Sequence, residues 1–547
     1  MANNANMQPI FILQEGTQRS QGKSAQKTNI AAAKAVAEAV RTTLGPKGMD
    51  KMLVDTLGDI TITNDGVTIL NEMSIDHPSA KMIVEVAKTQ ESEVGDGTTT
   101  AVILAGELLA NAEKLLDSNI HPTVIARGYR MAAEKSMVIL KNISEDISQK
   151  DTEQLKKIAI TAMTGKGAES AKDHLAAIAI KAVKRVIEKD KDSIYYNKDD
   201  IKIEKKVGGS IEESQLIEGI AIDKERVHSG MPRVVRNAKV AVIDSSIEVK
   251  GPETDAKIQI TSPDQLESFV MQEEKMIKEM VERIAASGAT VVICQKGIDE
   301  IAQHFFAKRG IFAVRRVKRS DISAIAKATG AKVITSLKEL NKEDLGNAGL
   351  VEQVRFGEDD MIFIKECKNP QAVTIIIKGA TNHVVDEIKR AMEDAIGDTA
   401  AALVDGKVVA GAGSPEMEIA RNLRKFAEGL SGREQLAVLA FADAMEVIPK
   451  TLAENAGLDP IDIITELKAA HDKGMKWGGV DVSTGKINDA WKKGVVEPMR
   501  VKKQAISSAS EVAEMILRID DVIAAAGGAS EDIRRPPAGG MGADMPF

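Results

Sequence analysis

The stretch Gly95-Asp96-Gly97-Thr98-Thr99-Thr100 lies between two segments whose apolar residues recur at helical spacing, residues 79–93 and 102–116. It is therefore predicted to be a glycine-rich turn that opens directly into a helix. Such a turn presents unpaired backbone N–H groups and the positive end of the helix dipole, and both attract phosphate. An ordinary helix start, capped by Asp or Thr, is the alternative interpretation.

Asp96 favours a cation at this turn. A carboxylate is repelled by phosphate unless a hard cation lies between them, and Mg2+ prefers a carboxylate together with phosphate oxygens and waters. Two earlier glycine-containing turns carry Lys47 and Asp65. Each could be only a helix stop or a turn, but in combination they provide what a nucleotide and its metal require. The P-loop pattern is absent from the sequence, so a P-loop protein is excluded.

Two later charged residues also suggest a site. Lys166, in Thr164-Gly165-Lys166-Gly167, is either part of a plain turn or placed to contact a terminal phosphate. Asp394 is predicted to fall in the last turn of a helix over residues 384–396, just before Gly397. A carboxylate there opposes the helix dipole, which favours a functional role, although acidic residues near helix ends are common.

Composition narrows the class of protein. The chain has 547 residues, 43% hydrophobic and 28% charged, which predicts a globular protein of two to four domains. Its net charge of −8 argues against nucleic acid or an anionic membrane as partner. Cys294 and Cys367 fit no disulfide framework or zinc spacing and are expected in the core. Without a signal-like start or a membrane-length apolar run, a cytoplasmic location is expected.

Periodicity predicts helices at both ends of the chain and strands in between. Residues 24–44 read as a helix, residues 59–63 and 67–70 as a β-hairpin, and residues 151–219 as largely helical. Short apolar runs then alternate with helical segments, which is typical of an α/β domain. Those runs are residues 239–244, 289–294, 311–314, 331–335, 361–364 and 372–377.

A long helix is predicted inside this α/β region. Ser262-Pro263-Asp264-Gln265 is a capping box with proline at the first helical position, and helical character continues to about Ser287. A polar tip at residues 250–255 precedes it. Glu273 and Glu274 interrupt its apolar stripe, so it is either a projection that docks outside its own domain or an ordinary surface helix.

In these features the chain resembles group II chaperonin subunits, the archaeal thermosome and the related eukaryotic cytosolic chaperonin. The order and spacing of the matching motifs agree over essentially the whole length. One departure is Gly411-Ala412-Gly413, where the family usually has three glycines; the extra methyl would crowd the nucleotide or restrict the turn. The motifs are Leu44-Gly-Pro-Lys-Gly-Met49, Thr63-Asn-Asp-Gly66, Gly95-Asp-Gly-Thr-Thr99, Gly165-Lys-Gly167, Gly411-Ala-Gly413 and Gly494-Val-Val-Glu-Pro498.

The resemblance implies a multi-domain α and α/β protein with the chaperonin fold. A mostly helical equatorial domain would comprise residues 1–150 and 405–547, and a small intermediate domain residues 151–219 and 370–404. An α/β apical domain, residues 220–369, would carry a helical protrusion at about 245–287. The protrusion would form a built-in lid without a separate co-chaperonin. Two stacked rings of eight subunits would enclose unfolded client proteins.

The resemblance also implies the cofactors ATP and Mg2+ and assigns residues to them. Asp96 would bind Mg2+, Asp394 would orient the attacking water with help from Asp65, and Lys166 would sense the terminal phosphate. The phosphates would be contacted by Thr43, Leu44, Gly45, Pro46, Gly95, Asp96, Gly97, Thr98, Thr99 and Thr100. Asn64, Gly411 and Gly413 would complete the pocket, with Asp481, Val482, Ser483 and Glu497 near the base and ribose.

The expected function is that of an ATP-dependent molecular chaperone, an ATPase that couples hydrolysis to enclosure of unfolded proteins. Because Asp65 and Asp96 would lie on one domain and Asp394 on another, the catalytic set would be complete only after a domain closure. An ATP-using small-molecule kinase or ligase is one alternative, but no convergent His, Arg or Cys set suggests an acceptor pocket. The other, a nucleotide-binding ring scaffold without turnover, is disfavoured by the three aspartates together.

Overall fold

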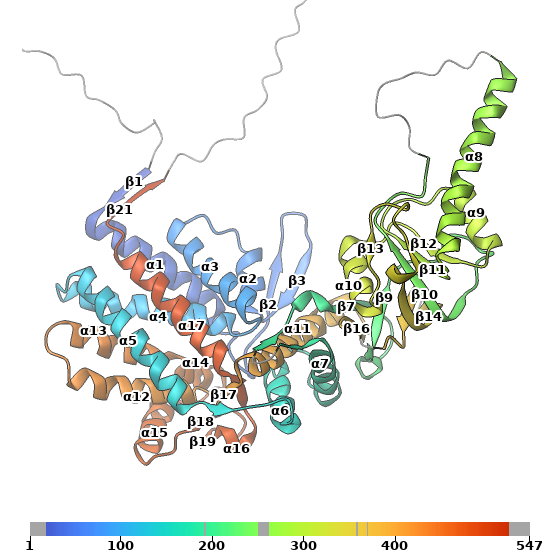
Figure 1. Ribbon diagram of the computed structural model, residues 1–547. Coiled ribbons are helices and arrows are strands. Elements are labelled where there is room, and N and C mark those ends of the chain that lie inside the picture. The colour runs from blue at the N-terminus through green and yellow to red at the C-terminus, as the bar shows by residue number, and fades with distance from the viewer. Residues whose placement is uncertain (1–17, 191–192, 250–261, 357–358, 369, 525–547) are drawn as a thin grey trace, which may run out of the picture.

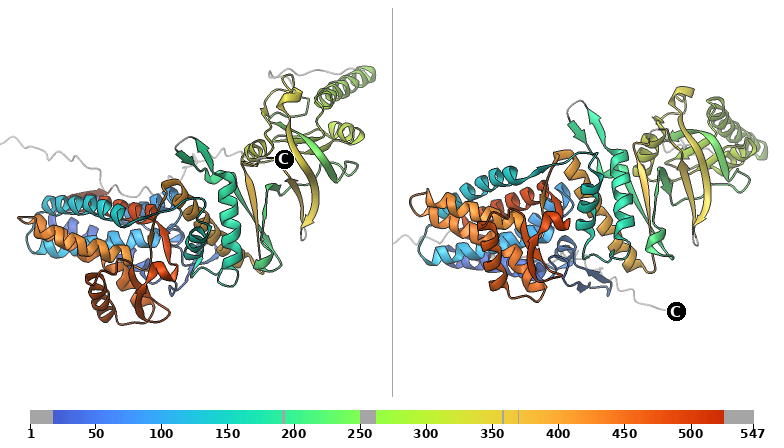
Figure 2. Two further views of the ribbon diagram at one scale, coloured as in Figure 1. Left: turned by 60° about the horizontal axis from the view of Figure 1, so that its bottom comes forward. Right: turned by 90° about the horizontal axis from the view of Figure 1, so that it is seen from below.

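The computed structural model describes residues 18–190, 193–249, 262–356, 359–368 and 370–524. These residues form three bodies in a row, a helical bundle at one end and a sheet with a long helix at the other (Figures 1 and 2). We call them the helical body (residues 18–146 and 409–524), the middle body (147–217 and 373–408) and the sheet body (219–372). Each has its own buried apolar core.

The helical body is built around α4 (Thr98–Asp117), which is buried along most of its length. Its core is rich in alanine, so helices approach closely: a Cβ at Gly106 would lie only 2.3 Å from the Ala37 Cβ on α1. The surrounding helices are α1 (Gly22–Arg41), α3 (Pro78–Glu93), α5 (Pro122–Ile143), α12 (Ser414–Glu428), α13 (Glu434–Met445) and α17 (Met499–Leu517).

Smaller elements complete this body. Strand β1 (Gln18–Gln21) pairs antiparallel with β21 (Asp521–Ala524), so the two ends of the described chain lie together. The strands β17 (Lys407–Ala410), β4 (Glu145–Asp146) and β20 (Val496–Pro498) form one sheet, and β18 (Gly478–Asp481) pairs with β19 (Lys486–Asp489). Short helices are α2 (Gly66–Glu72), α14 (Val447–Asn455), α15 (Pro460–Asp472) and α16 (Ala490–Lys493).

The predicted hairpin over residues 59–70 is wrong in its second half. Strand β3 (Ile60–Thr63) pairs with the preceding strand β2 (Lys51–Val54), and residues 67–70 belong to helix α2. Asp65 caps α2 by accepting a hydrogen bond from the Thr68 N–H at 2.9 Å. The residues that looked like a hairpin turn therefore start a helix, because their side chains satisfy its first backbone donors.

The middle body contains α6 (Thr152–Met163), α7 (Lys172–Val186) and α11 (Asn382–Asp405) beside the strands β7 (Ile201–Val207), β16 (Val373–Gly379) and β8 (Gln215–Ile217). Residues 151–219 are thus helical only up to Val186; β5 (Glu188–Asp190) and β6 (Ser193–Tyr195) follow. Helix α11 also continues through Gly397 to Asp405. Asp394 therefore lies in mid-helix, and the predicted conflict with the helix dipole is wrong.

The sheet body confirms the predicted α/β alternation. Its described strands form a seven-stranded sheet in the order β12-β11-β10-β14-β15-β9, with β13 paired to β10. Cys294 and Cys367 are buried here. The strands are β9 (Gly219–Ile222), β10 (Val234–Ile243), β11 (Val291–Cys294), β12 (Phe312–Val314), β13 (Val333–Ile334), β14 (Gly346–Phe356) and β15 (Asp359–Lys365), and the shorter helices are α9 (Glu300–Lys308) and α10 (Arg319–Thr329).

The predicted long helix is confirmed as α8 (Pro263–Ala286), whose 24 residues extend about 36 Å. Its cap Ser262 accepts a hydrogen bond from the Gln265 N–H at 3.4 Å. The first part of α8 projects beyond the sheet (Figure 1). The polar tip at 250–255 lies outside the described residues. No helix within the described part of the chain is long and apolar enough to cross a membrane.

Candidate functional site

A cavity of about 420 Å³ lies between the helical body and the middle body. The turn after α1, the start of α4, the turn after α6 and strand β18 surround it. Seventeen of the twenty residues that the resemblance assigns to ATP line this cavity: Thr43, Leu44, Gly45, Pro46, Asn64, Asp65, Asp96, Gly97, Thr98, Thr99, Thr100, Lys166, Gly413, Asp481, Val482, Ser483 and Glu497.

The other three assigned residues lie just behind the wall. Gly95 packs against α11, because a Cβ on it would lie 3.6 Å from Gly397 Cα. Gly411 lies beneath Glu497, whose Oε1 would be 2.3 Å from a Cβ at that position. Asp394 reaches the cavity through an ion pair with Lys166. All three thus support residues that line the cavity.

The start of α4 forms one end of the cavity and carries no side-chain cap. Gly97, the capping residue, has φ 80° and provides no side chain to accept a hydrogen bond from the first backbone N–H groups. The Gln90 amide holds the turn by donating to the Asp96 carbonyl at 2.8 Å. This arrangement favours the phosphate interpretation over an ordinary capped helix, because the first N–H groups of α4 remain available to an anion.

Asp65 lies beside this helix start. Its Oδ2 accepts hydrogen bonds from the Thr68 N–H at 2.9 Å and the Thr68 hydroxyl at 2.6 Å, and its Oδ1 accepts one from the Thr98 hydroxyl at 3.2 Å. Asn64, the preceding residue, donates to the Gly165 carbonyl at 2.7 Å. These bonds fix Asp65 between α2 and α4 and attach the turn that carries Lys166.

Lys166 connects two carboxylates from different bodies. Its Nζ pairs with Asp394 on α11 and lies 3.4 Å from Asp96 Oδ1. Burial alone would lower the pKa of Lys166, but Asp394 and Asp96 outweigh it and raise that pKa above its ordinary value. Burial, opposed by Lys166 but reinforced by Asp96 and Asp65, raises the pKa of Asp394 well above the usual carboxyl range. The raised pKa makes the ionised form of Asp394 a stronger base toward a water proton than an ordinary carboxylate.

A buried charge cluster in the wall of the cavity was predicted from the sequence only at Glu497. Lys502 Nζ lies 3.0 Å from Glu416 Oε1 and 2.7 Å from Glu497 Oε2, and Glu416 is only 2% exposed. Asp398, one turn after Asp394, is also buried, and burial raises its pKa well above the usual range. The i, i+4 spacing of the two aspartates was a usable signal. No pattern in the sequence connects Glu416 with Lys502.

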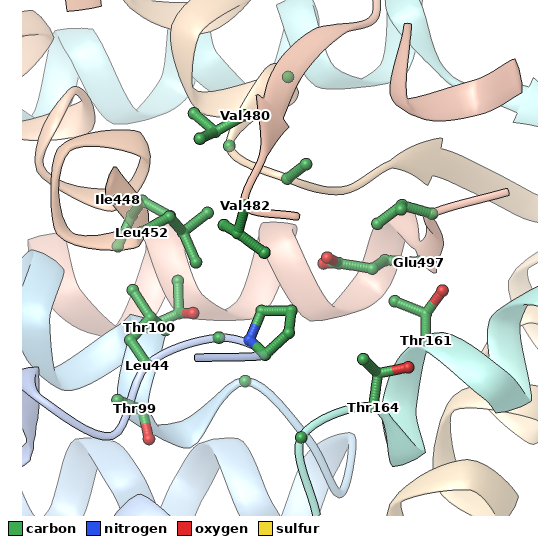
Figure 3. A pocket seen from close by; sticks show the side chains of 18 of the residues that line it. Leu44, Thr99, Thr100, Thr161, Thr164, Ile448, Leu452, Val480, Val482 and Glu497 are labelled. Atoms are coloured by element: carbon green, nitrogen blue, oxygen red, sulfur yellow. The ribbon is translucent and has the colours of Figure 1, made fainter. Parts of the chain in front are cut away.

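One side of the cavity is apolar. Figure 3 shows Ile448, Leu452 and Val482 on one side, facing Thr161, Thr164 and Glu497 on the other. Asp481 is engaged in its own turn, since its Oδ1 accepts from the Ser483 N–H at 3.0 Å and the Ser483 hydroxyl at 2.5 Å. The Ser483 hydroxyl bond outweighs burial and lowers the pKa of Asp481. The side formed by Ile448, Leu452 and Val482 therefore offers a contact surface for an apolar group.

The Ala412 methyl group has its own space. Ala412 adopts a left-handed conformation with φ 57°, and it lines the cavity next to Gly479. A Cβ at Gly479 would lie only 2.8 Å from the Ala412 Cβ. The missing side chain at position 479 therefore makes room for the methyl group that departs from the usual three-glycine motif.

The donor set fits a cation that takes few ligands from the protein. No group of three or more His, Cys, Asp or Glu side chains able to hold a metal occurs in the described ranges. Asp96 lines the end of the cavity where the uncapped helix begins, with Asp65 beside that helix start. That is the arrangement Mg2+ uses when phosphate oxygens and waters supply its other ligands.

A comparison with protein families identifies the fold. The model of the TCP-1/cpn60 chaperonin family matches residues 36–526. The chain belongs to this family. Among known chaperonins, it is 61% identical to thermosome subunit beta of Archaeoglobus fulgidus over 539 residues, 98% of each chain. It is 62% identical to the thermosome subunit of Methanopyrus kandleri over 516 residues, 94% of this chain and 95% of that subunit.

A solved structure specifies the type of chaperonin. The open-state monomer of a group II chaperonin from Methanococcoides burtonii matches 78% of this chain and 100% of its own, with a TM-score of 0.60 and 48% sequence identity. This chaperonin is therefore of group II, and the predicted multi-domain α and α/β chaperonin fold is confirmed.

Proposed function

We propose that this chaperonin is an ATP-dependent molecular chaperone that encloses unfolded proteins in a double-ring chamber, driven by ATP hydrolysis. The observation that carries the proposal is the contact of Lys166 with both Asp394 and Asp96. It joins a carboxyl group on the middle body to the uncapped helix start on the helical body. Hydrolysis of a phosphoanhydride requires this combination of a phosphate site and a positioned proton acceptor.

In the proposed mechanism, the N–H groups at the start of α4 and the turn after α1 would hold the phosphates, and Asp96 would hold Mg2+. When bound, Mg2+ neutralises charge that develops on the phosphate oxygens. Asp394 orients the attacking water and takes its proton. Asp65, held by Thr68 and Thr98, fixes the position of the first turn of α4. Lys166 exchanges its present carboxylate partners for the terminal phosphate.

Coupling to movement follows from where these residues lie. Asp394 belongs to α11, whereas Asp65 and Asp96 belong to the helical body. Apolar packing joins the two bodies through a cluster of Val94, Ala401 and Val501. Besides Lys166, polar contacts join them near the cavity, where Asn64 donates to the Gly165 carbonyl at 2.7 Å and Arg390 donates to the Ile62 carbonyl at 3.2 Å. A closing movement of the middle body would therefore deliver Asp394, and its reversal would remove it.

The sheet body supplies the proposed client and lid functions. Phe269, Val270 and Met271 on the projecting part of α8 are 43%, 52% and 60% exposed. Exposed apolar side chains of this kind mark a surface for other proteins. We assign them to capture of unfolded chains and to closure of the chamber as a built-in lid, without a separate co-chaperonin. Two stacked rings of eight subunits, working in the cytoplasm, complete the proposal.

In domain terms, the helical body would be the equatorial domain, the middle body the intermediate domain and the sheet body the apical domain. The proposed boundaries are residues 1–150 and 405–547, 151–219 and 370–404, and 220–369. A small-molecule kinase or ligase is not favoured for a member of this family. A ring scaffold without turnover differs only in lacking hydrolysis, so phosphate release separates it from the proposal.

Electron microscopy of the purified protein, combined with a phosphate-release assay, tests the function. We expect double rings that are open without nucleotide and closed with ATP and Mg2+, together with steady phosphate release. A monomer or dimer under both conditions would overturn the assembly. Closed rings without phosphate release would support the scaffold instead.

A further inference from the structure

A buried histidine lies behind strand β18 in the wall of the cavity. His471, in the last turn of α15, is 1% exposed. Its Nδ1 lies 2.8 Å from Glu418 Oε2 on α12, and its Nε2 lies 3.0 Å from the Gly478 carbonyl oxygen. His471 thus connects α12 to the start of strand β18 through its two ring nitrogens.

Glu418, the partner of His471 on α12, is held by further hydrogen bonds. Its Oε1 accepts hydrogen bonds from Arg421 at 3.0 Å and Asn422 at 2.8 Å, so both of its oxygens are engaged. Burial alone would raise the pKa of Glu418, but hydrogen bonds from His471 and Asn422 outweigh it and lower that pKa. Arg421 also donates to Asp472, the residue after His471, at 3.1 Å. The cluster thus fixes His471 firmly to α12.

The other partner of His471 belongs to the wall of the cavity. Gly478 is the first residue of β18, and the next three residues of the strand line the cavity. Val480 donates its N–H to the Ala412 carbonyl at 3.1 Å. On the side away from β19, β18 is therefore held at Gly478 by His471 and at Val480 by the turn that precedes α12. His471 does not itself line the cavity, and its ring contacts the strand that does at the Gly478 carbonyl oxygen.

We propose that His471 is a positioning residue for nucleotide recognition, which, anchored by Glu418, holds strand β18 in the position that receives the base. The proposal rests on the proposed nucleotide site and adds a residue remote from the phosphates. Its effect is on the affinity for the nucleotide and not on the hydrolytic step, because Asp394 and Lys166 lie on other elements.

The test compares His471→Gln with wild-type protein, both as assembled particles. A glutamine amide can satisfy one of the two acceptors and leaves the other buried without a partner. We expect the Kd for ADP, measured by calorimetry, and the KM for ATP to rise about tenfold, with kcat within about twofold. Glu418→Gln, which keeps the size of the side chain but removes its charge, should act in the same direction. Combined, the two changes should weaken binding no more than the stronger single change.

Glu514→Gln is the matched control. Glu514 is 8% exposed and pairs with Arg130 at 2.6 Å in the same body, but neither residue lines the cavity. This variant should lower Tm without changing the Kd for ADP. A His471→Gln protein with lowered Tm and unchanged Kd would overturn the proposal and leave His471 a structural residue. If the His471→Gln protein does not assemble, a Glu418→Gln protein that binds ADP with the wild-type Kd would overturn the proposal. Failure of wild-type protein to bind ADP would instead overturn the nucleotide site.

Discussion

Gly397 sets how closely α11 approaches the phosphate turn. A Cβ at this position would lie 2.7 Å from the Val94 carbonyl oxygen and 3.5 Å from Gly95 Cα. Non-bonded heavy atoms pack at about 3.5 Å, so Gly397→Ala should push the helix away from the turn by roughly 0.8 Å. The obstructing atom is the Val94 carbonyl oxygen, which belongs to the backbone and cannot move aside like the end of a flexible side chain.

Asp394 lies one helical turn before Gly397 and would move with it. Because a misplacement of about 1 Å can reduce a rate about 100-fold, we expect kcat for ATP hydrolysis to fall about 30- to 100-fold. This loss corresponds to roughly 2 to 2.7 kcal/mol of activation free energy. Alanine is also the better helix former, by about 1 kcal/mol, so a weakened helix would not explain the loss.

Phosphate release at saturating ATP measures this effect, and calorimetry with ADP shows whether the nucleotide still binds. The Kd for ADP should stay within about twofold of wild type, since the cavity-lining residues that would hold ADP lie mostly on the helical body. Lys389→Ala is the control on α11: its ammonium is 3.4 Å from Glu393 in a partly exposed pair and should be dispensable. Wild-type hydrolysis by Gly397→Ala would refute the reasoning, as would an equal loss of ADP binding.

Three further substitutions test the electrostatics and the backbone of the site. Burial, and to a smaller extent the negative charge of Asp65, raises the pKa of Glu91 from 4.5 to about 7. Ionising Glu91 is therefore harder in the folded protein than in the unfolded chain, and the free energy of unfolding falls as pH rises from 4.5 to about 7. Glu91→Gln should therefore raise Tm at pH 8 but not at pH 4, and an equal shift at both would contradict this. The left-handed conformation of Ala412 costs the folded protein about 1–2 kcal/mol, and Ala412→Gly relieves that cost. Because glycine also makes the unfolded chain more flexible, urea unfolding should show the free energy of unfolding raised by no more than about 1 kcal/mol; a decrease would contradict this. Lys502→Met leaves Glu416 and Glu497 buried without their cation and should cost about 3–5 kcal/mol in the same assay, whereas a change below about 1 kcal/mol would contradict the pairing.

The sequence was most informative where function depends on local backbone conformation. Gly95 and Gly97 have φ values of 94° and 80°, so the turn that starts α4 needs glycine at these positions, and its pattern could be recognised directly. The same local signals misled where packing decides the outcome. Gly397 suggested a helix end, yet α11 continues through it because the glycine packs against Val94 and Gly95.

Partners far apart in the chain could not be predicted. His471 and Glu418 lie on different helices, and neither has a distinctive neighbour pattern. The same holds for Lys502 and Glu416, whose pairing arises only when α17 and α12 pack together. Strand β3 pairs with β2 and not with the residues that follow it, because Asp65 starts a helix instead. Such choices depend on tertiary contacts that outweigh local propensity.

The most direct test of the central claim, that a carboxyl group on the middle body completes a nucleotide site on the helical body, is phosphate release by Asp394→Ala particles already loaded with ATP and Mg2+. The account predicts that these particles bind ATP and keep it as ATP, with release reduced at least about 100-fold. Phosphate release at the wild-type rate would contradict the role of Asp394 and the proposed link between hydrolysis and domain closure.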